Sequence, residues 1–86
     1  MTIETIEQEM KRLRWHCRRG IKEVEVKLGP YFENCYATLP ASKRLAFQRL
    51  LQCEDADLFD WVMQRDIPQD VELAELMDEM LKLKSD

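Results

Sequence analysis

Apolar residues recur at every third or fourth position along most of the chain, which is the spacing of amphipathic helices. The first series is Ile3, Ile6, Met10, Leu13 and Cys17, and it predicts a helix over residues 2–18. The second series is Ile21, Val24, Leu28, Phe32 and Cys35, and it predicts a helix up to about residue 35. Two features weaken the prediction of this second helix. Residues 23–27 alternate between charged and apolar as a strand would, and Pro30 should kink the helix near residues 26–28.

Proline and aspartate residues divide the rest of the chain. Thr38-Leu39-Pro40 indicates the end of one helix and the start of a third, with Pro40 in its first turn. Its buried side is expected to consist of Leu39, Ala46, Phe47, Leu50 and Leu51. Asp55 or Asp57 is expected to cap a fourth helix. That helix carries Leu58, Phe59, Trp61, Val62 and Met63.

Pro68 ends the fourth segment, and Asp70 is expected to cap a fifth helix. The inward residues of this helix are Leu73, Leu76, Met77, Met80 and Leu81. Lys82 and Lys84 lie near its C-terminus, where positive charge is favourable. The pattern therefore predicts one all-α domain over residues 1–86, a compact bundle of about five short helices.

Charge is distributed unevenly along the 86 residues. The net charge is −4 and the isoelectric point is near 5.0, which disfavours nucleic acid as the default partner. Residues 11–22 nevertheless carry only basic charges, whereas Arg65 is the only base among the ten acids of residues 54–79. The sequence thus predicts a bipolar molecule.

Few residues suggest chemistry of their own. His16 and Cys17 are adjacent and point about 100° apart on a helix, so they cannot share a metal ion on one face. Cys17 falls on the apolar series and is interpreted as a core residue. Gly20 and Gly29 cannot build a phosphate-binding loop. We therefore expect no catalytic residue, metal or cofactor of its own, and no enzyme activity.

The sequence predicts no targeting or membrane-spanning segment. The chain begins without a basic, then apolar, secretory segment, and no apolar run approaches the ~18 residues of a membrane span. We expect a bacterial cytoplasmic protein without membrane insertion.

The basic segment carries a candidate binding surface. Lys11, Arg14, Trp15, Arg18 and Lys22 share one helical stripe if the helix continues through Gly20. The stripe has three possible interpretations. It is a solvated face with Trp15 packed partway into the core, or a docking patch for an acidic protein surface. The third interpretation is a nucleic-acid site. The pattern alone does not choose between the first two interpretations.

The residues around Gly20 resemble a known family. The string Trp15-His16-Cys17-Arg18-Arg19-Gly20, with Glu23 three residues later, is followed by Gly29-Pro30-Tyr31-Phe32-Glu33. A second block runs from Leu50 to Met63. Together they resemble the succinate dehydrogenase flavinylation factors, known in bacteria as SdhE, whose hallmark is an RGxxE motif. The resemblance extends from about Met10 to Met80.

This resemblance implies a five-helix bundle that promotes covalent attachment of FAD to the flavoprotein subunit of succinate dehydrogenase, and in some bacteria of fumarate reductase. It implies that the factor holds no cofactor itself and acts on FAD bound to its partner. The motif residues Arg19, Gly20 and Glu23 would lie at the interface. Arg19 would pair with a partner carboxylate or carbonyl, Gly20 would allow close approach, and Glu23 would accept hydrogen bonds.

Arg12, Trp15 and Arg18 are further candidates for the same partner-binding surface. The alternative function is that of a small regulatory or nucleic-acid-binding helical protein that uses the basic stripe.

Overall fold

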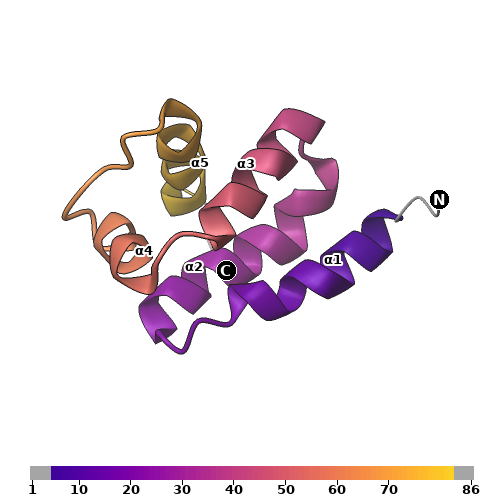
Figure 1. Ribbon diagram of the computed structural model, residues 1–86, viewed down its shortest axis with the longest axis horizontal. Helices are drawn as coiled ribbons and strands as arrows, with labels where there is room; N and C mark the ends of the chain where they lie inside the picture. Colours follow the sequence, from indigo (N-terminus) through magenta and orange to yellow (C-terminus); the bar gives the residue numbers. More distant parts are fainter. Residues whose placement is uncertain (1–4, 83–86) are drawn as a thin grey trace.

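Five α-helices and two short 3₁₀ helices make up the part of the chain that the structure, a computed structural model, describes, residues 5–82 (Figure 1). They are α1 (Ile6–Arg14), η1 (Trp15–Cys17), α2 (Lys22–Cys35), η2 (Tyr36–Thr38), α3 (Ala41–Leu51), α4 (Asp55–Val62) and α5 (Val71–Lys82). No strand occurs within residues 5–82. The prediction of an all-α bundle is confirmed.

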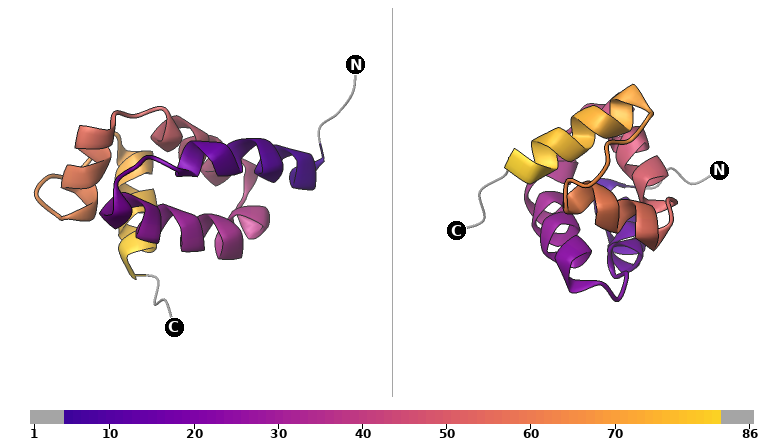
Figure 2. Two further views of the ribbon diagram at one scale, coloured as in Figure 1. Left: turned by 90° about the horizontal axis from the view of Figure 1, so that it is seen from below. Right: turned by 90° about the vertical axis from the view of Figure 1, so that its left-hand side faces the viewer.

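Helix α2 is the centre of the bundle. It contacts η1, α4 and α5, and α3 packs against α5 (Figures 1 and 2). Four aromatic rings on α2, η2 and α3 form the middle of the core, with centroids 5.1–6.0 Å apart: Tyr31, Phe32, Tyr36 and Phe47. Such ring pairs stabilise a core beyond the area they bury.

The predicted apolar positions supply most of the core. Buried residues include Leu13, Cys17, Val24, Leu28, Phe32, Ala46, Phe47, Leu50, Leu51, Leu58, Val62, Leu73, Leu76, Met77 and Met80. Leu39 and Leu81 are partly buried. Met63, which the fourth helix was expected to carry, follows the last residue of α4, and its side chain is 45% exposed. Ile3 and Lys84 lie outside the described residues.

The first two helices differ in detail from their predictions. Helix α1 starts at Ile6, because Thr5 and Gln8 bond reciprocally to each other's backbone N–H in a capping box. It ends at Arg14, and one 3₁₀ turn follows. Helix α2 runs through Pro30, and the strand-like residues 23–27 are helical. Tertiary burial of Val24 and Leu28 therefore outweighs the local β pattern.

The last two helices begin differently from one another. Asp70 caps α5 as predicted, since its Oδ1 accepts hydrogen bonds from the backbone N–H groups of Glu72 and Leu73. The predicted cap of α4 is wrong. Glu54 occupies the N-cap without a side-chain bond, and Asp55 is the first helical residue. The Asp55 carboxylate is instead bonded to Arg19.

Candidate partner-binding site

The segment between η1 and α2 turns sharply at Gly20. Arg18 and Ile21 have extended backbones, and Gly20 has a φ of +79°. This left-handed conformation favours glycine, because a side chain would clash with its own backbone. The helix therefore does not continue through Gly20, and the predicted continuous basic stripe is wrong.

Arg19 is held inside the chain by four hydrogen bonds. Its Nε donates to Asp55 Oδ1 (2.8 Å), and its Nη1 donates to the carbonyls of His16 (3.1 Å) and Leu51 (2.7 Å). Its Nη2 donates to the Cys53 carbonyl (2.7 Å). Only 16% of the side chain is exposed. The expected carboxylate and carbonyl partners of Arg19 are thus found within its own chain.

These bonds join the motif segment to the junction of α3 and α4. The Leu51 carbonyl belongs to the last residue of α3, where helix carbonyls lack backbone donors. The guanidinium satisfies it and places positive charge at a helix C-terminus, while Asp55 places negative charge at the start of α4. Arg19 therefore fixes the position of the Gly20 turn.

Gly20 is exposed and open on its outer side. A Cβ built on it would meet no atom within 4 Å, so packing within the chain does not require glycine here. Its N–H donates to Glu25 Oε2 at 2.7 Å. Sequence reasoning missed both Glu25 and Asp55 as supports of this turn. Asp55 lies 36 residues from Arg19, so no local pattern joins the two.

Glu23 is the second residue of α2, in its first turn, and its side chain is exposed. Its carboxylate makes no hydrogen bond or ion pair with any residue between 5 and 82. It therefore remains available as an acceptor for a group outside the chain.

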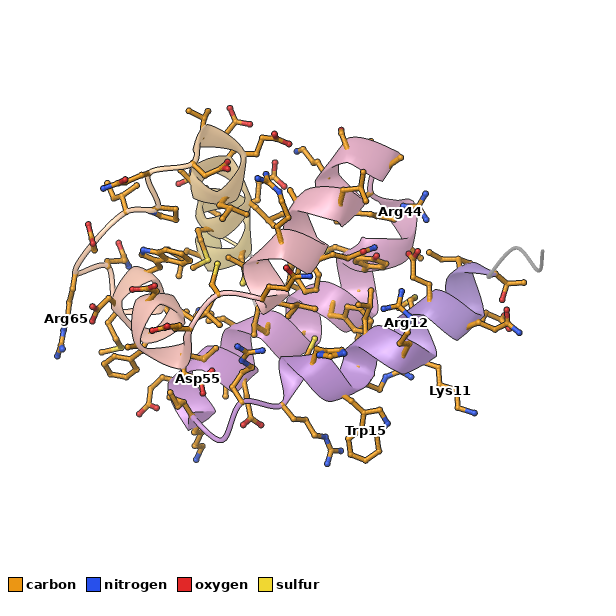
Figure 3. All side chains as sticks on the ribbon, viewed as in Figure 1. Lys11, Arg12, Trp15, Arg44, Asp55 and Arg65 are labelled. Atoms are coloured by element: carbon orange, nitrogen blue, oxygen red, sulfur yellow. The ribbon has the colours of Figure 1, made fainter. Side chains whose placement is uncertain are left out.

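Trp15 and Arg18 lie next to the turn. The Trp15 side chain is 73% exposed and points away from the body of the protein (Figure 3). The interpretation that Trp15 packs partway into the core is therefore wrong. The Arg18 guanidinium lies 5.5 Å from the centre of the Trp15 ring, a cation–π pair on the surface. Arg12 is also exposed, on α1 (Figure 3).

Other groups nearby serve the fold. Arg14 pairs with Glu33 (2.7 Å) and lies over the Phe32 ring, which neutralises part of the basic segment. Cys17 is buried, as predicted, and this burial raises the pKa of its thiol to about 11. The reactive thiolate is therefore disfavoured.

Residues 5–82 lack two further features. No group of three or more His, Cys, Asp or Glu side chains in this range is arranged to hold a metal ion. None of the helices in the range combines the length and apolarity needed to cross a bilayer.

Comparison with known proteins places the site within a family. Residues 11–84 match the family Sdh5, the flavinator of succinate dehydrogenase. The chain belongs to this family. A curated relative from Pseudomonas aeruginosa, FAD assembly factor SdhE, is 45% identical over 71 residues, which cover 83% of this chain and 84% of the relative. Proteins of the same name from Pectobacterium atrosepticum and Yersinia pseudotuberculosis are 46% and 44% identical over 66 residues, which cover 77% of this chain and 75% of each relative.

The flavinator family match includes the whole Gly20 turn. It therefore confirms the resemblance inferred from the RGxxE motif and assigns the chain to a class of assembly factors. Within that motif the structure separates two kinds of residue. Arg19 is bonded inward, whereas Gly20 and Glu23 face solvent together with Trp15 and Arg18.

Proposed function

We propose that this flavinator family member binds the flavoprotein subunit of succinate dehydrogenase and promotes covalent attachment of FAD to it. In a bacterium that has a fumarate reductase, its flavoprotein subunit is a second target. One observation carries the proposal: an RGxxE turn fixed from inside by Arg19 presents Gly20 and Glu23 to solvent. We place the factor in the bacterial cytoplasm.

The contribution of this chain is positioning. The turn is already ordered before binding, so little conformational entropy is lost when a partner docks. The absent side chain at Gly20 lets a partner backbone approach, and Glu23 accepts hydrogen bonds from it. Trp15 and Arg18 provide a large side chain and a charge beside the turn, the residue types that dominate binding energy at interfaces. FAD and the bond-forming groups belong to the flavoprotein, and correct placement alone accelerates such a reaction.

The nucleic-acid alternative has less support. The stripe on which it relied is interrupted at Gly20, and Arg14 is paired with Glu33. With a net charge of −4, the remaining bases are better suited to steering an acidic protein surface. Reversing Arg18 to Glu should slow association with the flavoprotein. The rate of the unaltered chain should fall as salt rises.

The test is flavinylation of purified apo-flavoprotein subunit with FAD, in the presence and absence of this chain, followed by flavin fluorescence of the denatured subunit in a gel. The chain should increase covalent flavin, and Glu23→Gln should reduce the increase. Glu7→Gln is the matched control, because Glu7 is an exposed acid in the first turn of α1. An equal effect of the two substitutions would remove Glu23 from the site. No increase with the unaltered chain would refute the function.

Calorimetry of the isolated chain with FAD separates an assembly factor from a flavin carrier. We expect no saturable heat, because the chain has no glycine-rich dinucleotide cradle. Saturable binding would make the chain itself the carrier of FAD.

A further inference from the structure

The acidic half of the chain contains more carboxylates than its own cations neutralise. Five of the ten acids in residues 54–79 form ion pairs with bases of the chain: Asp55, Asp70, Glu72, Asp78 and Glu79. The other five make no ion pair with any residue between 5 and 82: Glu54, Asp57, Asp60, Asp66 and Glu75. Arg65, the single base in the segment, lies over the Phe59 ring at the outer edge of the molecule (Figure 3). This half therefore carries a local negative field.

Two of the unpaired acids line a groove at the connection between α4 and α5. Two adjoining hollows share Trp61, Asp66, Ile67 and Pro68 as lining residues. Asp57 and Asp70 contribute to the lining of one, and Asp78 contributes to the lining of the other. The lining of both, drawn from the described residues, contains neither lysine nor arginine. We call these two hollows the Ile67 groove.

Apolar surface is exposed in the same place. Ile67 is 72% exposed. Met63 and Val71, which lie close in sequence to the residues that line the groove, are 45% and 70% exposed. These are three of the six large apolar side chains that the described part of the fold leaves exposed. Exposed apolar groups rimmed by charge, as Ile67 is here, are typical of protein-binding surfaces.

The groove is formed by an ordered connection, which projects from the bundle between α4 and α5 (Figures 1 and 2). The N–H of Gln64 donates to the Trp61 carbonyl (3.1 Å), and the N–H of Arg65 donates to the Asp60 carbonyl (2.8 Å). This is the Schellman arrangement that closes a helix C-terminus. Pro68 is buried beneath the groove and Asp70 caps the next helix. The surface is therefore preformed, as a docking site requires.

We propose that the Ile67 groove binds a basic, amphipathic segment of a partner protein. An apolar side chain of that segment packs against Trp61 and Ile67, and its lysine or arginine side chains pair with Asp57 and Asp66. Charge complementarity identifies the occupant, because the lining contains apolar surface and no lysine or arginine. Its Asp70 and Asp78 are paired with Arg49 and Lys82, which leaves Asp57 and Asp66 for the cations of a partner. The carboxylates do not converge on one point, since residues 5–82 contain no metal-binding cluster. Separate charges along a groove match separate cations along a peptide.

A second copy of the chain fits less well. Its concentrated bases lie in residues 11–22, on a surface formed by α1, η1 and the Gly20 turn, and none of them lines the groove. Joining that surface of one copy to the groove of the next is a heterologous contact, which produces open-ended chains unless the rotation closes a ring. The proposal also goes beyond the flavinylation function, because the groove and the Gly20 turn are built from different residues.

The test is a titration of the ¹⁵N-labelled full chain with a designed peptide, monitored by NMR. The probe is a capped helical peptide of about twelve residues that has leucine on one face flanked by lysines. We expect shifts of the Trp61 indole N–H and of the backbone N–H groups around Ile67. Binding should weaken as salt rises from about 50 to 300 mM. The double variant Asp57→Asn/Asp66→Asn should weaken it about tenfold.

Matched variants distinguish the groove from general attraction of a cation to an acidic protein. Ile67→Ser should weaken binding, whereas Val26→Ser should not, because Val26 is an exposed apolar residue on α2. Equal effects of Ile67→Ser and Val26→Ser would overturn the proposal. So would shifts spread over all acidic surfaces, or no binding at millimolar peptide. Shifts at the groove that grow with protein concentration without peptide would overturn it in favour of self-association.

Discussion

Replacing Arg19 with alanine should destabilise the protein before it affects any partner. The variant loses four hydrogen bonds, made to Asp55 and to the carbonyls of His16, Leu51 and Cys53. It also removes the positive charge at the C-terminus of α3. The Gly20 turn would then lose its attachment to the α3–α4 junction.

The magnitude follows from the number and exposure of these bonds. Hydrogen bonds to a charged group contribute roughly 1.5–3 kcal/mol each, but bonds that share one side chain do not add. The Asp55 side chain is 45% exposed, so its ion pair is screened and counts for little. The bond to the His16 carbonyl is exposed, whereas those to the Leu51 and Cys53 carbonyls are part-buried, so water can replace only part of what is lost. We expect Arg19→Ala to lower the free energy of unfolding by about 2–4 kcal/mol, and Arg19→Lys by about half of that.

Urea unfolding followed by circular dichroism measures this loss. A chain of 86 residues has a total stability of about 4–13 kcal/mol, so the variant should remain folded at low temperature. Arg14→Ala is the matched control, because Arg14 and Glu33 are each about half exposed, at 49% and 50%. This control should lose no more than about 1 kcal/mol. In a double-mutant cycle, Arg19 and Asp55 should couple by about 0.5–1 kcal/mol.

A small effect would refute the reasoning. If Arg19→Ala loses less than about 0.5 kcal/mol and yet abolishes flavinylation, Arg19 acts on the partner directly. If it loses about 3 kcal/mol and flavinylation falls in proportion to the disordering of the turn, its role is to position Gly20.

Three further predictions concern backbone conformation and ionisation. Gly20→Ala should lower the free energy of unfolding by about 1 kcal/mol, because Gly20 has a φ of +79° and not because the added Cβ meets another atom. Gly20→Arg should cost a similar amount and should reduce flavinylation more steeply. Denaturation and in-gel flavin fluorescence check the pair, and normal flavinylation by the arginine variant would make Gly20 merely structural. Gln64 has a φ of 61° at the end of α4, so Gln64→Gly should raise the free energy of unfolding by about 0.5–1 kcal/mol, and a loss in urea unfolding would contradict this. Burial raises the pKa of Cys17 to about 11 and that of Tyr36 to about 12, so both groups ionise more readily in the unfolded state. The free energy of unfolding should therefore keep its full value below pH 9 and should fall between pH 9 and about 12. Melting temperatures measure this, and Cys17→Ala should flatten the fall between pH 9 and 11.

Helices and core could be predicted because both follow from local spacing. Leu13, Val24, Leu50 and Met80 fall on apolar series and are buried. The exceptions have physical causes. Met63 follows the last residue of α4, where the backbone leaves the helical path, and its side chain turns to solvent. The capping box at Thr5 carries a signal in the sequence, a threonine followed three residues later by glutamine, and it sets the start of α1.

The candidate site was predictable in position but not in its division of roles. The motif Arg19-Gly20-x-x-Glu23 indicates which residues matter, and family membership supports that reading. The motif does not indicate whether the arginine faces a partner or its own chain, because the residue and its sequence neighbours are the same in both cases. The difference depends on the Leu51 carbonyl and the Asp55 carboxylate, which only the packing of α3 and α4 brings within 2.8 Å of Arg19. An inward-bonded arginine and an outward-facing glutamate on either side of a left-handed glycine form a rigid turn. The loss of any one of the three should therefore impair binding, but only the loss of Arg19 or Gly20 should also lower stability.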